Sequence, residues 1–372
     1  MQRKAKAVLC RELNKPVVVE EISVDPPKRG EVTIKVAACG VCHSDLSATN
    51  GTIALPPPLV LGHEGAGEIV ELGEGTALGN AGLALGDHVV SSFIYMCGKC
   101  RFCVSGRPVL CLEQHKALTT PLEGTPRVRD KAGKPLGIFS GCGVMAEYAT
   151  LSAENVIRID PKIPLDRAAL VGCAVTTGVG AVFNTARVEP GSSVAVFGCG
   201  GVGLNVIQGA AIAGAERIIA IDTLQAKLEV AKRFGATDAL LAKEGEDVAK
   251  ALKKLTGGGP DYAFECVGVG ALAEAAYRAI RRGGKAVIVG VARPTDSAAF
   301  KPMTMVFEEK TLQGSYFGSC VPRVDFPRML HLYMAGKLKL DELITQRYRV
   351  EEAPQAFADL ASGKNARGVI VF

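Results

Sequence analysis

The stretch "PGSSVAVFGCGGVG", residues 190–203, reads as a turn, a buried strand and a glycine-rich turn in direct succession. Gly198, Gly200 and Gly203 stand in G-x-G-x-x-G spacing, and the helix-like segment "LNVIQGAAIAGA" follows. The next strand-like segment, "RIIAID", ends at Asp222, nineteen residues after Gly203. A strand before the glycines, a helix after them and an acidic residue about 20 residues further on indicate a dinucleotide-binding unit.

The glycine turn and Asp222 also indicate which dinucleotide binds. The glycines permit a tight turn in which backbone N–H groups approach a pyrophosphate at the positive N-terminus of the helix. Asp222 would accept hydrogen bonds from both hydroxyls of the adenosine ribose, and no arginine follows it to receive a 2′-phosphate. The sequence therefore favours NAD over NADP, and the predicted coenzyme-binding residues are Gly198, Gly200, Gly201, Gly203 and Asp222.

Strand-like and helix-like segments continue to alternate after Asp222. The helix-like segments are "LQAKLEVAKRFG", "EDVAKALKKLTGG" and "ALAEAAYRAIRRGG", and the strand-like ones are "DALLA", "DYAFEC" and "KAVIVGV". This alternation predicts an α/β fold with a doubly wound parallel sheet of strand order 3-2-1-4-5-6, a Rossmann domain, over residues 175–316. Residues 1–174 and 317–372 would form a second domain, which the coenzyme domain interrupts.

Four cysteines occur within residues 97–111, "CGKCRFCVSGRPVLC". Their C-x2-C-x2-C-x7-C spacing, with glycines that let the loop bend, allows four thiolates to surround one tetrahedral zinc ion. Packed thiols or an iron–sulfur site are the alternatives. Because four sulfur ligands leave no open position, we expect a structural zinc site made by Cys97, Cys100, Cys103 and Cys111.

A second set of metal-type residues is dispersed along the chain. Cys42 occurs in "CGVCHSD", His63 in "LGHEGAGEIVELG" and Cys173 in "ALVGCAVTTGVGA". Two cysteines and one histidine leave a fourth position for water or substrate, which is the composition of a catalytic zinc site. Asp45 and Glu64 are near enough in sequence to support these ligands. Each residue taken alone is also typical of a packed thiol or of a polar loop residue.

Composition excludes several classes of protein. The chain has 372 residues, 48% of them hydrophobic, so it can build large cores without disulfides, and two domains are expected. The N-terminus lacks an apolar stretch of signal-peptide length, and no run of eighteen apolar residues occurs, so we expect a cytoplasmic protein with reduced thiols. The net charge of +5 is evenly spread, which argues against nucleic acid or a membrane as partner.

Together the motifs resemble those of the zinc-dependent medium-chain alcohol dehydrogenases. The segments "CGVCHSD", "GHEGAGEIVELG", "CGKCRFC", "GCAVTTG", "GCGGVG" and "NARGVIVF" occur in the family's order and near its spacing, over essentially the whole chain. The resemblance implies a GroES-like, mainly β catalytic domain with both zinc sites, a Rossmann domain, and an active-site cleft between them. It also implies two zinc ions per chain, NAD, and a small-molecule alcohol or aldehyde as substrate.

The resemblance implies roles for individual residues. The family's catalytic zinc ligands correspond to Cys42, His63 and Cys173, and the acids behind them to Glu64 and Asp45. Positions that contact the coenzyme correspond to His43, Thr177, Val202, Lys227 and Arg367. Ser44 matches the hydroxyl that touches the substrate oxygen and passes its proton toward the nicotinamide ribose. The family's relay often ends at a histidine where this chain has Ser47, which is no base near neutral pH, so water or another group would complete it.

The substrate prediction depends on side chains near the expected pocket. The chain resembles the longer branch of the family, which includes glutathione-dependent formaldehyde dehydrogenase and aromatic alcohol dehydrogenases. The loop "ATNGTIALPPPLV" has no carboxylate for a glutathione conjugate, and His115 stands where that enzyme has an arginine. The predicted pocket residues are apolar: Ile53, Phe93 and Met145. With Ser44 in place of a bulkier threonine, they favour medium-chain or aromatic primary alcohols and some secondary ones.

Two alternative functions remain beside alcohol oxidation. S-(hydroxymethyl)glutathione dehydrogenase is the alternative within the family, and a non-catalytic protein that binds zinc and NAD is the alternative outside it. The resemblance also implies a homodimer, or a tetramer, in which the segment "KTLQGSYFGS", residues 310–319, pairs with its symmetry mate at an otherwise open sheet edge.

Overall fold

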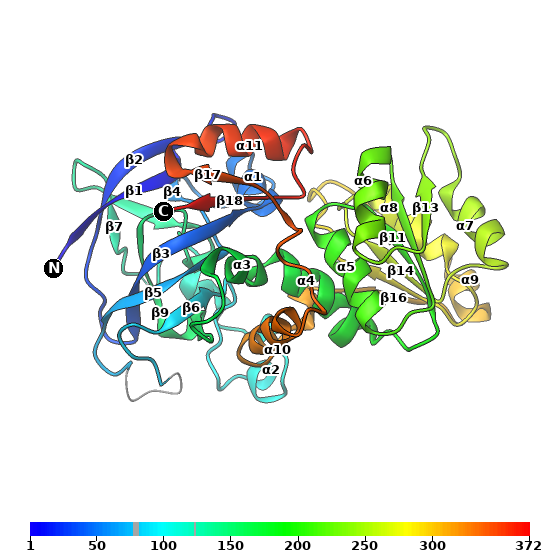
Figure 1. The fold of residues 1–372 in the computed structure, drawn as a ribbon, viewed down its shortest axis with the longest axis horizontal. Helices are drawn as coiled ribbons and strands as arrows, with labels where there is room; N and C mark the ends of the chain where they lie inside the picture. The colour runs from blue at the N-terminus through cyan, green and yellow to red at the C-terminus, as the bar shows by residue number, and fades with distance from the viewer. Residues whose placement is uncertain (77–81, 123) are drawn as a thin grey trace. The chain divides into compact units, whose positions relative to one another are not determined.

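The computed structural model describes residues 1–76, 82–122 and 124–372, and the chain forms two compact units. The first unit comprises Met1–Cys173, Val321–Met334 and Leu340–Phe372, and the second comprises Ala174–Cys320 and Ala335–Lys339. Figure 1 shows the strands of the first unit and the helix-covered sheet of the second. The main segment of the second unit, Ala174–Cys320, corresponds to the range 175–316 that the sequence predicts for the coenzyme domain, and the short segment Ala335–Lys339 belongs to the same unit.

The first unit is built from two sets of strands. A closed barrel contains β1 (Arg3–Cys10), β2 (Val18–Val24), β7 (Val128–Arg129), β8 (Pro135–Ile138) and β4 (Leu59–Val60). A seven-stranded sheet has the order β10 (Val156–Arg158), β6 (His88–Ser91), β5 (Gly65–Leu72), β3 (Glu31–Val41), β18 (Arg367–Val371) and β17 (Ile344–Arg349), with β9 (Tyr148–Ser152) also paired to β3. The helices of this unit are α1 (His43–Thr49), α2 (Arg101–Val104), α3 (Leu165–Ala169), α10 (Pro322–Met334) and α11 (Ala353–Ala361).

Strand β3 organises the first unit. It runs antiparallel to β5, β9 and β18, and nearly all of its side chains are buried because neighbours cover it on both faces. The strand ends at Val41, and α1 begins at His43 directly afterwards. Cys42 therefore lies where the central strand of the sheet turns into a short helix.

The second unit is a parallel sheet of six strands. Its order is β13 (Asp238–Leu241), β12 (Arg217–Asp222), β11 (Ser193–Phe197), β14 (Tyr262–Glu265), β15 (Lys285–Ile288) and β16 (Thr311–Gly314). Its helices are α4 (Ala174–Gly180), α5 (Gly201–Ile212), α6 (Gln225–Arg233), α7 (Val248–Thr256), α8 (Gly270–Ala279) and α9 (Pro302–Phe307), and a π-helical turn, Ala181–Ala186, follows α4. Counted along the chain, the strand order is 3-2-1-4-5-6, which confirms the predicted Rossmann topology.

The glycine turn packs as tightly as its sequence predicts. A Cβ atom at Gly203 would lie 1.8 Å from the carbonyl oxygen of Gly198, so only glycine lets helix α5 begin against the end of β11. Gly198 itself has φ +90°, in the left-handed region that favours glycine.

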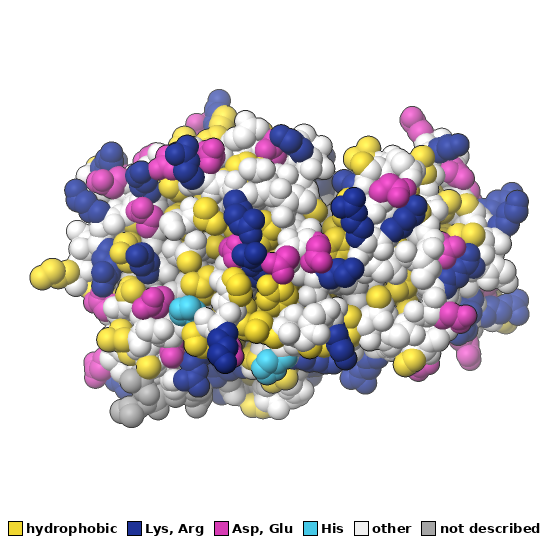
Figure 2. Space-filling view, in the orientation of Figure 1, with side chains coloured by type: hydrophobic (Ala, Val, Ile, Leu, Met, Phe, Trp, Pro, Cys, Tyr) yellow, Lys and Arg dark blue, Asp and Glu magenta, His cyan; other side chains and the backbone are white. Residues whose placement is uncertain are grey.

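The surface is mixed in charge. Figure 2 shows Lys and Arg side chains interspersed with Asp and Glu over the face drawn. Within the described residues, no single helix is both long and apolar enough to cross a membrane; only the bent pair Leu165–Gly172 and Ala174–Ala186 meets that length and composition together.

A buried ion pair stabilises the first unit. Nε and Nη2 of Arg127 donate to the two carboxylate oxygens of Glu31 at 2.6 and 3.0 Å, and their side chains are only 4% and 1% exposed. The Lys28 backbone N–H donates to the same carboxylate at 2.9 Å. The pair thus joins the segment before β7 to the start of β3, in a place where an unpaired charge would be costly.

We predict that Arg127→Met lowers the free energy of unfolding by about 3–5 kcal/mol, because it leaves the Glu31 carboxylate buried without its partner. The double variant Glu31→Met/Arg127→Met should recover much of the loss, since neither charge remains. Urea unfolding followed by circular dichroism measures both. The exposed pair Lys4–Glu21, 3.5 Å apart, supplies the control, and Lys4→Met should cost less than about 1 kcal/mol. Equal small losses at both sites would contradict the prediction.

Candidate functional site

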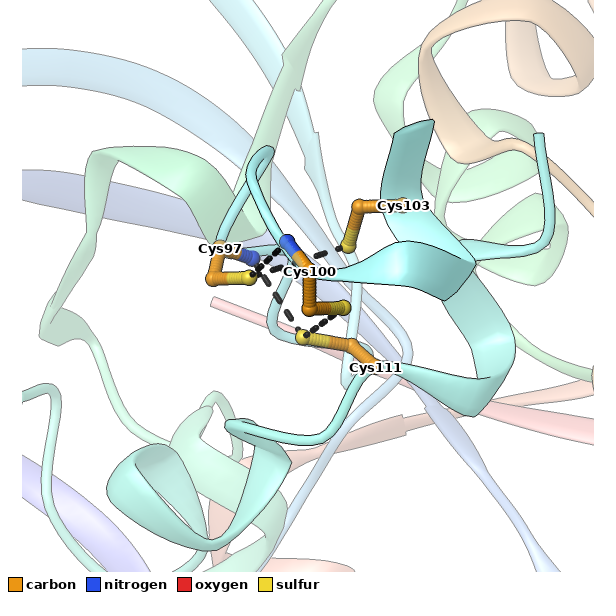
Figure 3. Close-up of side chains that lie close together, drawn as sticks. All are labelled: Cys97, Cys100, Cys103 and Cys111. Atoms are coloured by element: carbon orange, nitrogen blue, oxygen red, sulfur yellow. Dashed lines mark hydrogen bonds between the residues drawn. The ribbon is translucent and has the colours of Figure 1, made fainter. Parts of the chain in front are cut away.

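The four cysteines of the segment 97–111 converge in the folded chain. Figure 3 shows their sulfur atoms facing a common centre. Sγ of Cys97 lies 4.0 Å from Sγ of Cys103, and Sγ of Cys100 lies 3.9 Å from Sγ of Cys111. With a metal–sulfur distance of about 2.3 Å, the sulfur atoms of a tetrahedral zinc site are about 3.8 Å apart. The cluster therefore has the dimensions of a four-sulfur zinc site.

Backbone amides favour the thiolate form in this cluster. The N–H of Cys100 donates to Sγ of Cys97 at 3.3 Å, and the N–H groups of Cys97 and Glu113 both donate to Sγ of Cys111 at 3.4 Å. Backbone hydrogen bonds, first from Cys103, lower the pKa of Cys100 to about 6, whereas burial raises that of Cys103 to about 12. Because a zinc site takes the thiolate form, metal binding would release the protons that these sulfurs carry.

A second group of metal-type side chains forms inside the first unit. One ligand atom each from Cys42, His63, Glu64 and Cys173 lies within 4.8 Å of all the others, and all four residues are buried. Cys42 stands between β3 and α1, His63 and Glu64 immediately precede β5, and Cys173 follows the 3-10 turn Leu170–Gly172. Sequence reasoning named all four, and only the fold brings them together.

Asp45 orients the histidine of this group. Its Oδ1 accepts the N–H of Gly62 at 2.9 Å, and its Oδ2 lies 3.2 Å from Nδ1 of His63. Neither Nδ1 nor Nε2 of His63 has a hydrogen-bond partner within the described part of the chain, and Nε2 lies 4.0 Å from Oε1 of Glu64. A carboxylate behind one ring nitrogen, with the other free, is the usual arrangement of a histidine that binds metal.

Charges inside this group are strongly coupled. A hydrogen bond from Cys173, helped by the charge of His63, holds the pKa of Cys42 well below its usual value, and the same bond raises the pKa of Cys173. Burial opposes protonation of His63, but Asp45 and the Cys42 thiolate together raise its pKa well above the ordinary value. A metal ion takes thiolates and a neutral imidazole, so it would displace these protons.

Glu64 and Arg367 form a wholly buried pair beside the ligands. Nη2 of Arg367 donates to Oε2 of Glu64, while Oε1 of Glu64 has no hydrogen-bond partner among the described residues and lies 4.0 Å from Nε2 of His63. Burial raises the pKa of Glu64 to about 7, against the opposing charge of Arg367. A Cβ at Gly40 would lie 2.2 Å from Oε2, so glycine is required for the carboxylate to fit. The resemblance assigned Arg367 to a coenzyme phosphate; in the structure its charge faces Glu64.

Aromatic rings flank His63. The ring of Phe93 meets it edge to face at 5.6 Å between centroids, and the ring of Phe139 does so at 5.3 Å. The sequence predicts Phe93, which is partly exposed, for the pocket; it gives no signal for Phe139, which lies in the apolar segment "GIFSG" and is almost wholly buried in the core. Ile53 packs against the core while remaining partly exposed. Met145, which the sequence also predicts for the pocket, is wholly buried in the same core cluster as Phe139.

The remaining predicted residues lie on local structure that suits them. Asp222 ends β12, where its carboxylate accepts the N–H groups of Cys199 at 2.8 Å and of Leu224 at 3.1 Å. It therefore reaches the glycine turn and holds it. Gly201, Val202 and Gly203 open α5, Thr177 lies in α4, and Lys227 lies in α6. In α1, His43 is exposed, while Ser44 and Ser47 are half-buried.

The donor sets fit two different metal sites. Four sulfur atoms from a single loop give a closed site, whereas two sulfurs, one imidazole and a nearby unpartnered carboxylate oxygen leave room for an exogenous ligand. The second group also buries more acidic groups than basic ones, which a divalent cation would offset.

Comparison with known proteins agrees with this chemistry. Two family models match: "Alcohol dehydrogenase GroES-like domain" at residues 28–161 and "Zinc-binding dehydrogenase" at residues 201–335. S-(hydroxymethyl)glutathione dehydrogenase of Synechocystis sp. is 40% identical over 377 residues, covering 99% of each chain. NDMA-dependent alcohol dehydrogenase of Amycolatopsis methanolica is 40% identical over 372 residues, again covering 99% of each. The crystal structure of benzyl alcohol dehydrogenase from Acinetobacter calcoaceticus has a TM-score of 0.91 and 31% identity, covering 100% of this chain and 99% of that one.

We predict two zinc ions per chain, one for each cluster. Cys173→Ala should remove the zinc bound by Cys42, His63 and Cys173. The fold should stay intact, because these ligands stand next to separate strands and helices that fold without the metal. Cys103→Ala should remove the other and lower the thermal midpoint, because a structural zinc contributes to folding. Metal analysis by mass spectrometry, paired with thermal unfolding, separates the two effects. A single zinc in the untreated protein, or the same loss of stability in both variants, would argue against two distinct sites.

Proposed function

The chain belongs to the zinc-dependent medium-chain alcohol dehydrogenase family, and on that premise we propose that it oxidises medium-chain or aromatic primary alcohols, and some secondary ones, with NAD. It is an oxidoreductase that acts on CH–OH groups. The observation that carries the proposal is the buried group of Cys42, His63 and Cys173, with Glu64 beside it. Two sulfurs and one imidazole leave the fourth position of a tetrahedral zinc for water or substrate.

Each residue of that group has a proposed role. Cys42, His63 and Cys173 would hold the catalytic zinc, which when bound acts as a Lewis acid and lowers the pKa of an alcohol toward neutrality. Asp45 fixes the orientation and tautomer of His63 from behind. Glu64 and Arg367 balance charge beside the ligands. Cys97, Cys100, Cys103 and Cys111 would hold the second zinc, which stabilises their loop.

The proton and the hydride leave by separate routes in this proposal. Ser44 would accept a hydrogen bond from the alcohol and pass its proton toward the nicotinamide ribose and solvent. Ser47 provides no base at the next position, so water would complete the path. The hydride would pass to the nicotinamide of NAD. Coenzyme contacts are proposed for the glycine turn, Asp222 and the set His43, Thr177, Val202, Lys227 and Arg367.

The substrate class follows from the side chains around His63. Phe93 is partly exposed and meets His63 edge to face, and Ile53 is also partly exposed against the same core cluster. Phe139 supports the imidazole from within the core. Aromatic rings pair favourably edge to face, so this environment suits an aryl or alkyl group. The likeness to a benzyl alcohol dehydrogenase structure supports the same class.

S-(hydroxymethyl)glutathione is the second candidate substrate, because a relative 40% identical over nearly the whole chain carries that name. Against it stand the absence of carboxylates from residues 48–60 and the presence of His115, whose Nδ1 is already 3.2 Å from the carbonyl of Leu112. Each missing charged contact would cost on the order of 2 kcal/mol.

We also propose a homodimer formed through the second unit. Strand β16 is the last strand of the sheet and pairs only with β15 among the described strands, so its outer edge is open. Beside it in sequence, α9 exposes Met303, Val306 and Phe307 by 69–79%. An apolar surface next to an open edge suits pairing with a second copy.

A substrate panel tests the proposed function. We expect NAD-linked activity with benzyl alcohol and octanol at a kcat/KM at least tenfold above that with hydroxymethylglutathione. Phe93→Ala should lower kcat/KM for benzyl alcohol by roughly tenfold and that for ethanol by less, because ethanol cannot use the ring. A preference for hydroxymethylglutathione would establish the second candidate. No alcohol-dependent NADH formation by protein with both zinc ions bound would indicate the non-catalytic alternative.

The coenzyme preference has its own test. Asp222→Gly should raise the KM for NAD and narrow the gap to NADP, because it removes both the ribose acceptor and the repulsion of a 2′-phosphate. Asp222→Asn is the matched control, since it keeps an acceptor for the Cys199 N–H but not the charge. Steady-state kinetics with both coenzymes decide the matter. A wild-type preference for NADP would refute the role of Asp222.

A further inference from the structure

A buried carboxyl group that no step above uses lies at the end of strand β14. Glu265 is the last residue of that strand and has no solvent exposure. It pairs in register with Phe197, the last residue of β11, and with Ile288, the last residue of β15. In a sheet of order 3-2-1-4-5-6, ligands bind outside the carboxyl ends of the strands, where the order reverses between the first and fourth strands. Glu265 stands at that place.

The carboxyl group holds the loop that follows β14. Its Oε1 accepts the N–H of Val267 at 2.8 Å and the N–H of Gly268 at 2.7 Å. Oε2 has no hydrogen-bond partner in the described part of the chain. Burial raises the pKa of Glu265, and the amides of Gly268 and Val267 oppose the rise. Burying a carboxyl group costs free energy unless hydrogen bonds compensate it, and both bonds accepted by Oε1 come from the loop after β14.

Glu265 also ties this loop to the loop after β15. The backbone carbonyl of Glu265 accepts the N–H groups of Val289 at 2.8 Å and Gly290 at 3.0 Å. A Cβ at Gly290 would lie 2.1 Å from the amide nitrogen of Gly268 and 2.7 Å from Oε2 of Glu265. The two loops therefore touch through backbone atoms, with the carboxyl group packed between them.

The glycine turn completes the assembly. A Cβ at Gly198 would lie 2.5 Å from Cγ2 of Val267, so the loop held by Glu265 packs directly on the first glycine of the coenzyme motif. The Cys266 N–H also donates to the carbonyl of Phe197 at 3.0 Å. This backbone bond, and the bond from the Cys199 N–H to Asp222, do not involve the Glu265 side chain, so the turn after β11 keeps these contacts when the carboxyl group is lost.

We propose that Glu265 is a positioning residue for the nicotinamide half of the coenzyme. The inference rests on the proposed use of NAD. The half of the sheet that contains β11 and β12 holds the adenosine through Asp222, and the half that contains β14 and β15 faces the nicotinamide nucleoside. Glu265 acts through the two loops it holds, and the adenosine half depends on it only weakly.

Binding measurements separate the two halves without requiring catalysis. NADH binding is followed by coenzyme fluorescence, and ADP binding, which lacks the nicotinamide nucleoside, by calorimetry. Glu265→Ala should weaken NADH binding roughly tenfold, the effect of losing two hydrogen bonds that order the loop, while ADP binding changes less than about threefold. Glu265→Gln keeps an accepting oxygen and should restore most of the NADH affinity. Asp222→Ala should weaken both ligands together.

Leu252→Ala is the control for general destabilisation. Leu252 is wholly buried in the core of the second unit, so its removal should lower the thermal midpoint and leave the ratio of NADH to ADP affinity unchanged. Equal weakening of NADH and ADP in Glu265→Ala, or no weakening of NADH in a folded variant, would overturn the inference. Failure of the wild-type protein to bind either ligand would instead overturn the proposed function.

Discussion

Burial of charge beside His63 is the constraint on which the first unit depends. Two thiols, an imidazole, the carboxyls of Asp45 and Glu64 and the guanidinium of Arg367 are all almost completely excluded from water. Such a group is stable only if its charges compensate one another and a cation. The sheet meets this demand because β3, β5 and β18 are adjacent, so Cys42, Glu64 and Arg367 approach from three neighbouring strands. Gly40 leaves the space that the Glu64 carboxylate fills.

In the second unit, carboxylate side chains hold the loops that follow the parallel strands. Because the strands are parallel, the carboxyl ends of β11, β12, β14 and β15 lie along one side of the sheet, where the chain leaves each strand through a loop. Asp222 and Glu265 both use a carboxylate to hold backbone N–H groups of those loops: Asp222 holds Cys199 and Leu224, and Glu265 holds Val267 and Gly268. Acidic side chains thus hold the loops at which a dinucleotide would bind. Of the two, only Asp222 would contact the dinucleotide directly.

Local motifs were read correctly where their geometry is set by nearby residues. The strand order of the second unit follows from alternation of strands and helices, because right-handed crossovers leave few topologies. Residues remote in sequence were harder to place. Met145 and Phe139 lie six residues apart and are both buried in one core cluster, and only the tertiary structure shows that the ring of Phe139 contacts His63. The sequence did not indicate a role for Glu265, because an acidic residue at the end of a strand is usually exposed to solvent, whereas Glu265 is buried.

The sequence by itself determined the Rossmann topology, the glycine turn and the four-cysteine loop, since each is specified by spacing within a short segment. The sequence also pointed to Cys42, His63, Glu64 and Cys173, but it did not show that their ligand atoms lie within 4.8 Å of one another. Tertiary structure alone decided that convergence, the pairing of Arg367 with Glu64 and the tie made by Glu265. The physical reason is that spacing along the chain fixes local backbone geometry, whereas burial and charge pairing depend on which distant strands become neighbours.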